Sequence, residues 1–211
     1  MEPVTLTSER LVLHPLRAED IPAVHRACQD PEIARWTAVP SPYEWEDAKS
    51  FVTEFSPDGW RNETMFNFGA YLRGTGELVS SIGLARPANP AWERIAEIGY
   101  WTAREHRRRG YTAEGVTAVA RWAFTALGVQ RLEWLAEVGN TGSRAVAEKA
   151  GFTIEGTLRS RIVHRGTRRD AWIGSLLPSD LGLPEKPPAL PYLPYRGGAA
   201  ADGAPAADGR R

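Results

Sequence analysis

Hydrophobic and polar residues alternate along much of the chain with a period of two, which is typical of strands with one buried face. The first such run is Arg10–Leu16. Two more, Phe66–Arg73 and Glu77–Ala85, are joined by Gly74-Thr75-Gly76, the composition of a tight hairpin turn. Further strands are predicted at Ile95–Trp101, Arg131–Ala136, Phe152–His164 and Asp170–Leu177, the last two pairing across Gly166-Thr167.

Apolar residues at helical spacing predict four helices between these strands. The most regular stripe ends at Gly128 and consists of Val116, Val119, Ala120, Ala123, Phe124 and Leu127. Asp20 and Pro22 start an earlier helix that runs to Cys28. The run Ser41-Pro42-Tyr43-Glu44 has the pattern of a capping box and predicts a helix through Phe55. Asn140 is the predicted cap of a short helix over Thr141–Ala150.

The order of these elements predicts an α/β (α+β) fold. We expect a mixed, mostly antiparallel central sheet of about seven strands flanked by about four helices. Residues 1–182 form a single predicted domain, without internal repeats. Residues 183–211 are crowded with Pro, Ala and Gly and are predicted to be a disordered tail.

Composition excludes several classes of protein. The formal net charge is zero, so no global field attracts nucleic acid or an anionic membrane, and neither partner is expected. No stretch of about 18 apolar residues is present, so no membrane span is predicted. The single cysteine, Cys28, fits a reducing cytoplasm and is interpreted as a small buried residue, with a nucleophile as the alternative. The four histidines lack metal-ligand spacing, so no metal is expected.

The segment between the strand Ile95–Trp101 and the striped helix carries the candidate chemistry. It contains Arg107, Arg108 and Arg109 followed by Gly110. N–H groups in the first turn of a helix lack intrahelical acceptors and carry partial positive charge, so a basic turn before a long helix suits a pyrophosphate. Gly110 would let the backbone approach the phosphates closely. The alternative is an ordinary solvated basic face.

Four short motifs occur in the order found in one family. They are Glu97-Ile-Gly-Tyr-Trp101, Arg107-x-x-Gly110, Asn140-x-x-Ser143 and Glu148-Lys-Ala-Gly-Phe152. Over residues 8–182 the chain resembles the GNAT superfamily of N-acetyltransferases, in particular its RimJ/RimL-like branch. Arg35-Trp36, Arg169-Asp170 and Ser175–Asp180 are similar to that branch as well. Arg108 and Thr112 depart from the family pattern, which often has glycine at the first position and usually has glycine or alanine at the second.

The resemblance implies a site for acetyl-CoA as co-substrate. It places the pyrophosphate on the turn before the helix and the pantetheine along the strand end, between two strands that splay apart. The residues implied in binding are Trp101, Thr102, Arg107, Arg108, Arg109, Gly110, Tyr111, Thr112 and Asn140. Asn140 is equally suited to a purely structural cap.

The resemblance also implies direct attack of an acceptor amine on the thioester, without a nucleophilic side chain. Glu97 is the preferred general base, because a partly desolvated carboxylate has a raised pKa; a buried polar pair or a solvent-facing side chain is the alternative. Ser143 is the candidate that protonates the departing sulfur, or an ordinary first-turn serine.

Trp36 and Trp101 are expected beside the acceptor, which is either a peptide N-terminus or a small-molecule amine. A CoA-binding regulatory module without turnover is the alternative function. Exposed strand edges make a homodimer a reasonable expectation.

Overall fold

The computed structural model describes residues 1–86 and 93–184. Its eight strands form one sheet in the order β1-β2-β3-β4-β5-β6-β8-β7, in which only β5 and β6 are parallel neighbours. The strands are β1 (Leu6–Thr7), β2 (Leu11–His14), β3 (Met65–Leu72), β4 (Leu78–Ala85), β5 (Ile95–Thr102), β6 (Arg131–Glu137), β7 (Thr153–His164) and β8 (Thr167–Leu176). The predicted fold class is confirmed, with the short β1 as an additional strand.

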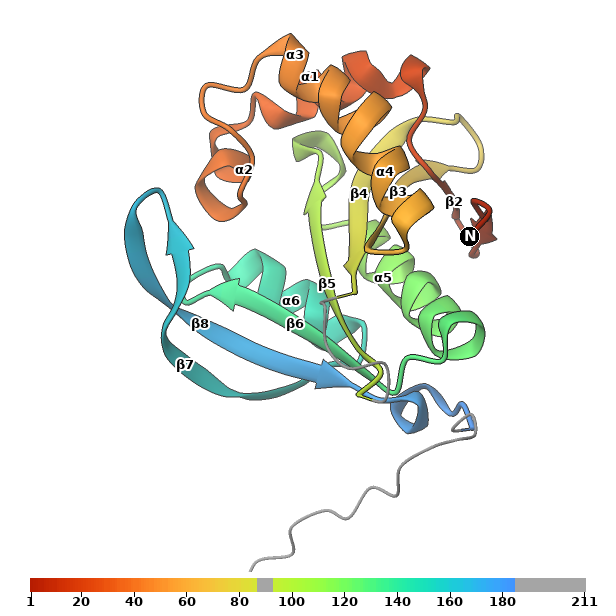
Figure 1. Ribbon diagram of the computed structural model, residues 1–211, viewed down its shortest axis with the longest axis vertical. Helices are drawn as coiled ribbons and strands as arrows, with labels where there is room; N and C mark the ends of the chain where they lie inside the picture. The colour runs from red at the N-terminus through yellow and green to blue at the C-terminus, as the bar shows by residue number, and fades with distance from the viewer. Residues whose placement is uncertain (87–92, 185–211) are drawn as a thin grey trace, which may run out of the picture.

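Helices cover part of both faces of this sheet (Figure 1). They are α1 (Ile21–Cys28), α2 (Pro31–Trp36), α3 (Trp45–Ser50), α4 (Ser56–Asn62), α5 (Tyr111–Trp122) and α6 (Thr141–Lys149). In Figure 1, α1 to α3 gather over one end of the sheet, while the hairpin of β7 and β8 projects towards α2. No helix in the described ranges has the length and apolar character needed to cross a membrane.

The main core lies between the sheet and α5, as the stripe predicted. Val116, Val119, Ala120 and Ala123 are fully buried, and Phe124 is nearly so. A π-helical turn, residues 123–127, follows α5, and Gly128 closes it at φ 68°. Burial of this stripe supplies the apolar contact that holds α5, and with it the preceding turn, against β4 and β5.

The N-terminal helices differ from the prediction. The third helix is capped by Glu44, whose N–H donates to Asp47 Oδ2 (2.8 Å), so the proposed Ser41 cap is wrong. A π-helical turn, residues 51–55, follows α3, and the helix then continues beyond Phe55 into α4, which accommodates Pro57 near its start. α2 was not predicted, because its six residues are too few for a recognisable apolar stripe.

β5 and β6 separate after a short stretch of pairing. The register pairs join residues 95–97 of β5 to residues 131–133 of β6, although the two strands continue to Thr102 and Glu137. Beyond the Glu97–Glu133 pair, the facing edges of the two strands diverge, as Figure 1 shows. The splay implied by the family resemblance is therefore present. Of the predicted tail, only residues 183 and 184 fall within the described ranges.

Candidate active site

The turn before α5 has the backbone geometry of an anion cradle. Arg108 and Gly110 both have positive φ, 64° and 79°, and Gly110 is the N-cap of the helix. The first bond into α5 runs from Glu114 N–H to the Gly110 carbonyl (3.1 Å), so the N–H groups of residues 111–113 precede the regular ladder. Arg108 thus occupies a conformation that favours glycine, which explains why the family pattern often has glycine there.

Thr112, the second departure from the family pattern, has a structural role. Its side chain is buried, and its Oγ1 lies 2.6 Å from Thr102 Oγ1, a hydrogen bond that ties the first turn of α5 to the end of β5. Glycine or alanine at position 112 has no hydroxyl and could not form this hydrogen bond. Because this bond is internal, it does not occupy the backbone N–H groups that face the cradle.

Arg107 is partly engaged within the protein. Its guanidinium forms an ion pair with Asp30 (2.7 Å) and donates to the Thr102 carbonyl (3.2 Å). These contacts join the turn to the segment before α2, and the Asp30 carboxylate offsets part of the positive charge of Arg107. Arg107 thus orders the turn as well as adding positive charge to it.

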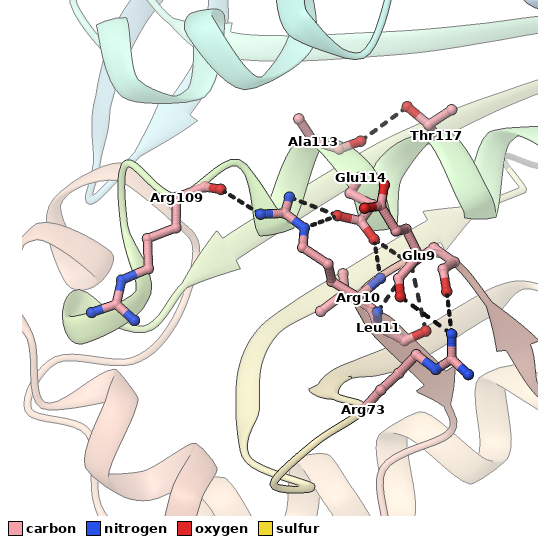
Figure 2. Close-up of polar contacts among 9 residues, drawn as sticks. Glu9, Arg10, Leu11, Arg73, Arg109, Ala113, Glu114 and Thr117 are labelled. Carbon is pink, nitrogen blue, oxygen red and sulfur yellow. Dashed lines mark hydrogen bonds and ion pairs between the residues drawn. The ribbon is translucent and has the colours of Figure 1, made fainter.

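The segment between β1 and β2 holds the other side of the turn in place (Figure 2). Arg10 donates from Nη1 to the Arg109 carbonyl (3.1 Å), and its Nε donates to Glu114 Oε2 (2.6 Å). Glu114 also accepts from the Ser8 hydroxyl (2.7 Å) and the Arg10 N–H (2.8 Å). In Figure 2 the Arg109 guanidinium points away from this network. Residues more than 90 positions apart thereby hold the backbone of the cradle in place.

Lys149 is a candidate binding residue that the sequence analysis missed. A Cβ added to Gly110 would lie 2.8 Å from Lys149 Nζ, so the ammonium group stands directly over the glycine of the cradle. Within the described ranges, no carboxylate lies within ion-pair distance of Lys149. A cation without an internal partner, above a helix N-terminus, suits a phosphate. The lysine lies in the motif Glu148–Phe152, but only tertiary packing brings it to Gly110.

Ser143, Tyr100 and Trp134 form a hydrogen-bonded group beside the splay. Trp134 Nε1 donates to Ser143 Oγ (3.0 Å), and the Tyr100 hydroxyl donates to the Ser143 carbonyl (2.8 Å). Asn140 Oδ1 accepts from the Ser143 N–H (3.1 Å), which confirms the predicted cap of α6. Burial raises the pKa of Tyr100 well above its usual range, and hydrogen bonds with Ser143 and Trp134 only partly oppose this. Tyr100 therefore stays protonated and acts as a donor.

One cavity of about 650 Å³ connects the cradle with these side chains. It is bordered by α2, the end of β5, the turn before α5, and α6 with its preceding loop. The predicted site residues that line it are Trp36, Trp101, Thr102, Arg107, Arg108, Gly110, Tyr111, Thr112, Asn140 and Ser143. Arg109 and Glu97 are not among its lining residues. The volume falls within the range of small-molecule and cofactor sites.

Glu97 lies on the face of β5 opposite Tyr100. Ile98, Tyr100 and Thr102 face α5 and α6, whereas Glu97 shares the other face with Trp101 because side chains alternate along a strand. Crowding by surrounding protein raises the pKa of Glu97; nearby Arg161 opposes the rise and Glu133 adds to it. The side chain still reaches solvent, so its desolvation is partial. Glu97 therefore lies on the face of the sheet opposite α5 and α6.

Cys28 is not a reactive nucleophile. The residue is 2% exposed in the smaller core beneath α1 to α3, and burial raises its pKa to about 12 against a hydrogen bond with Tyr43. The thiol therefore stays protonated at neutral pH, as its interpretation as a small buried residue requires.

The predicted absence of a metal stays a prediction. Potential ligand atoms of Glu77, Glu105 and His106 lie within 4.8 Å of one another, and both glutamates are exposed. His106 Nε2 is 3.2 Å from Glu77 Oε1, a contact that accounts for this grouping without an ion.

An open-edged mixed sheet with splayed central strands, and an anion cradle at the start of the long helix beside the splay, suit a transferase whose donor carries phosphate groups. Comparison with known proteins agrees. The profile of the family described as Acetyltransferase (GNAT) domain matches residues 10–153. The chain therefore belongs to the GNAT acetyltransferase family, and it is an acetyltransferase.

Relatives share most of the described chain. The uncharacterized N-acetyltransferase YoaA of Bacillus subtilis (strain 168) is 29% identical over 172 residues, which cover 82% of this chain and 96% of YoaA. Mycobacterium smegmatis RimJ, solved with CoA-disulfide, has a TM-score of 0.75 at 24% identity, covering 86% of this chain and 92% of RimJ. The ribosomal-protein-S5-alanine acetyltransferase of Vibrio fischeri has a TM-score of 0.70 at 16% identity, covering 82% and 96%. The likeness to these two structures shows that the chain shares their fold.

Proposed function

We propose that this protein is an acetyl-CoA-dependent N-acetyltransferase that acts on the amino group of a peptide or protein N-terminus. The observation that carries the proposal is the cradle itself: a glycine-capped helix N-terminus beneath the ammonium group of Lys149, at one end of the cavity that reaches Ser143. A protein acceptor is favoured over a small molecule because similar structures include the ribosomal-protein-S5-alanine acetyltransferase of Vibrio fischeri.

The residues of the cradle fit a diphosphate. The N–H groups that open α5, the Arg108 side chain and Lys149 supply donors and positive charge without a competing internal carboxylate within ion-pair distance of Lys149 in the described ranges. Acetyl-CoA bound there would supply the activated acetyl group. Backbone N–H groups along the unpaired edge of β5 would stabilise negative charge on the acetyl oxygen.

Protein side chains on the two faces of β5 divide the proton transfers. Glu97, with its raised pKa, would accept a proton from the acceptor ammonium on the open face. On the helical face, Ser143 would donate its hydroxyl proton towards the departing sulfur, held in position by Trp134 and Tyr100. No nucleophilic side chain is required.

Two measurements test the proposal together. Calorimetry should detect binding of CoA, and thiol release from acetyl-CoA should depend on an added amine. Binding without transfer to any amine would instead support the alternative of a CoA-binding module. Absence of CoA binding would refute both.

A further inference from the structure

The hairpin of β7 and β8 is strongly basic, in a chain whose net charge is zero. Its distal half contains a single acid, Asp170, and five arginines: Arg159, Arg161, Arg165, Arg168 and Arg169. Asp170 has a backbone partner within the hairpin, since its Oδ1 accepts a hydrogen bond from the Ser160 N–H (2.8 Å). Among the described residues, Arg169 alone of the five has a carboxylate within 4.0 Å, Glu137 at 3.9 Å. The charge of this hairpin is therefore largely uncompensated.

Two contacts place the hairpin at the rim of the cavity. Arg165 Nη2 donates to the Ala34 carbonyl (2.9 Å) on α2, between Ile33 and Trp36, which both line the cavity. His164 Nδ1 lies 3.4 Å from Glu137 Oε2, and Glu137 is two residues before the cavity residue Gly139. The approach of the hairpin tip to α2 is visible in Figure 1.

The same basic hairpin borders the face of the sheet that carries Glu97. The register pairs Glu97 with Glu133 and Glu137 with Ala171, so Glu97, Glu137 and Arg169 lie on one face. Arg161 is near enough to Glu97 to counter the rise in its pKa. An acceptor that enters from this face thus meets guanidinium groups at the rim and a carboxylate at the reacting end.

Positive charge at the rim and a carboxylate at the inner end complement a peptide that has a positive N-terminus followed by negative side chains. We infer that the acceptor, on the proposed function, is a polypeptide whose free N-terminus is followed within a few residues by Asp or Glu. The α-ammonium group would be directed to Glu97 and the acidic side chains to Arg165 and Arg169. Arginine suits this role because its planar fork binds carboxylates in a bidentate manner.

The inference is tested with three peptides that share their first two residues and continue with Asp and Glu, with Asn and Gln, or with Lys and Arg. For the wild-type enzyme, kcat/KM should be about tenfold higher for the acidic peptide than for the amide peptide, and this ratio should fall with added salt. Binding of the same peptides to the CoA-loaded protein, followed by fluorescence anisotropy, should give the same ranking.

The variant Arg165→Asn/Arg169→Gln should abolish the preference while leaving the Kd for CoA unchanged. Asparagine tolerates the positive φ of Arg165 (49°), so the turn is retained. Arg121→Gln is the matched control, because it also removes an exposed guanidinium that donates to a carbonyl, that of Leu181, on the outer side of α5. The control should keep the full preference.

The outcomes separate this inference from the proposed function. Transfer to peptides with equal kcat/KM for the acidic and amide sequences would overturn the inference alone. So would inhibition by an RNA oligonucleotide without any preference among the peptides. Preferential binding of the acidic peptide without transfer to any amine would support the docking surface and refute the enzymatic proposal.

Discussion

Glu114 offers a quantitative test of how the cradle is held. Its two carboxylate oxygens receive the Ser8 hydroxyl, the Arg10 N–H and the Arg10 guanidinium at 2.6 to 2.8 Å. The Glu114 side chain is 17% exposed and that of Arg10 is 43% exposed. Glu114→Gln keeps the shape and one acceptor oxygen but turns an amide towards the guanidinium. After discounting for solvent screening, we expect a loss of about 2 kcal/mol in the free energy of unfolding.

The pH dependence of this loss has a defined sign. Partial burial pulls the pKa of Glu114 upwards, but hydrogen bonds from Arg10 and Ser8 outweigh it, and the net shift is downwards. A carboxylate with a lowered folded-state pKa stabilises the protein above its unfolded pKa and loses this effect as pH falls through the folded value. The difference between wild type and Glu114→Gln should therefore be complete at neutral pH and shrink below about pH 4.5.

Urea unfolding, followed by tryptophan fluorescence, measures both effects. Glu148→Gln is the control, since Glu148 accepts from Arg144 at 2.8 Å but is 49% exposed. It should cost less than about 0.5 kcal/mol, as exposed pairs do. A Glu114→Gln loss no larger than that of the control would refute the reasoning. A loss that is constant across the acidic range would contradict the assigned role of the charge.

The remaining predictions concern binding and turnover. Lys149→Met should weaken CoA binding by about tenfold, because it removes a cation from the cradle, whereas Lys49→Met should leave calorimetric affinity unchanged; equal affinities would dismiss Lys149. Glu97→Gln should lower kcat with little change in CoA affinity. It should also remove the rise in rate that occurs as pH increases through the raised pKa of Glu97, and a rise that persists in the variant would exclude Glu97 as the base. Ser143→Ala should reduce kcat about tenfold or more in thiol-release assays, and full activity would leave Ser143 a purely structural residue.

Local patterns in the sequence were sufficient for most elements. The stripe from Val116 to Leu127 predicts α5 because burial of one helical face requires apolar residues at that spacing. Asn140 and Gly128 mark helix ends for equally local reasons, a side-chain cap and a left-handed conformation. The prediction failed where context overrode local chemistry, at the Ser41 cap and at Phe55, where the predicted helix ended but the chain continues into α4.

Only the tertiary structure decided how distant residues combine into a site. β8 lies between β6 and β7 in the sheet. This order brings the arginines of the last hairpin to the rim of the cavity beside α2. Packing of α6 against α5 brings Lys149 over Gly110, and the connection between β1 and β2 brings Arg10 to Glu114. Spacing along the chain determines which face of an element is buried, but it does not determine which elements become neighbours. That choice depends on the packing of the whole core, and it decides which charges meet.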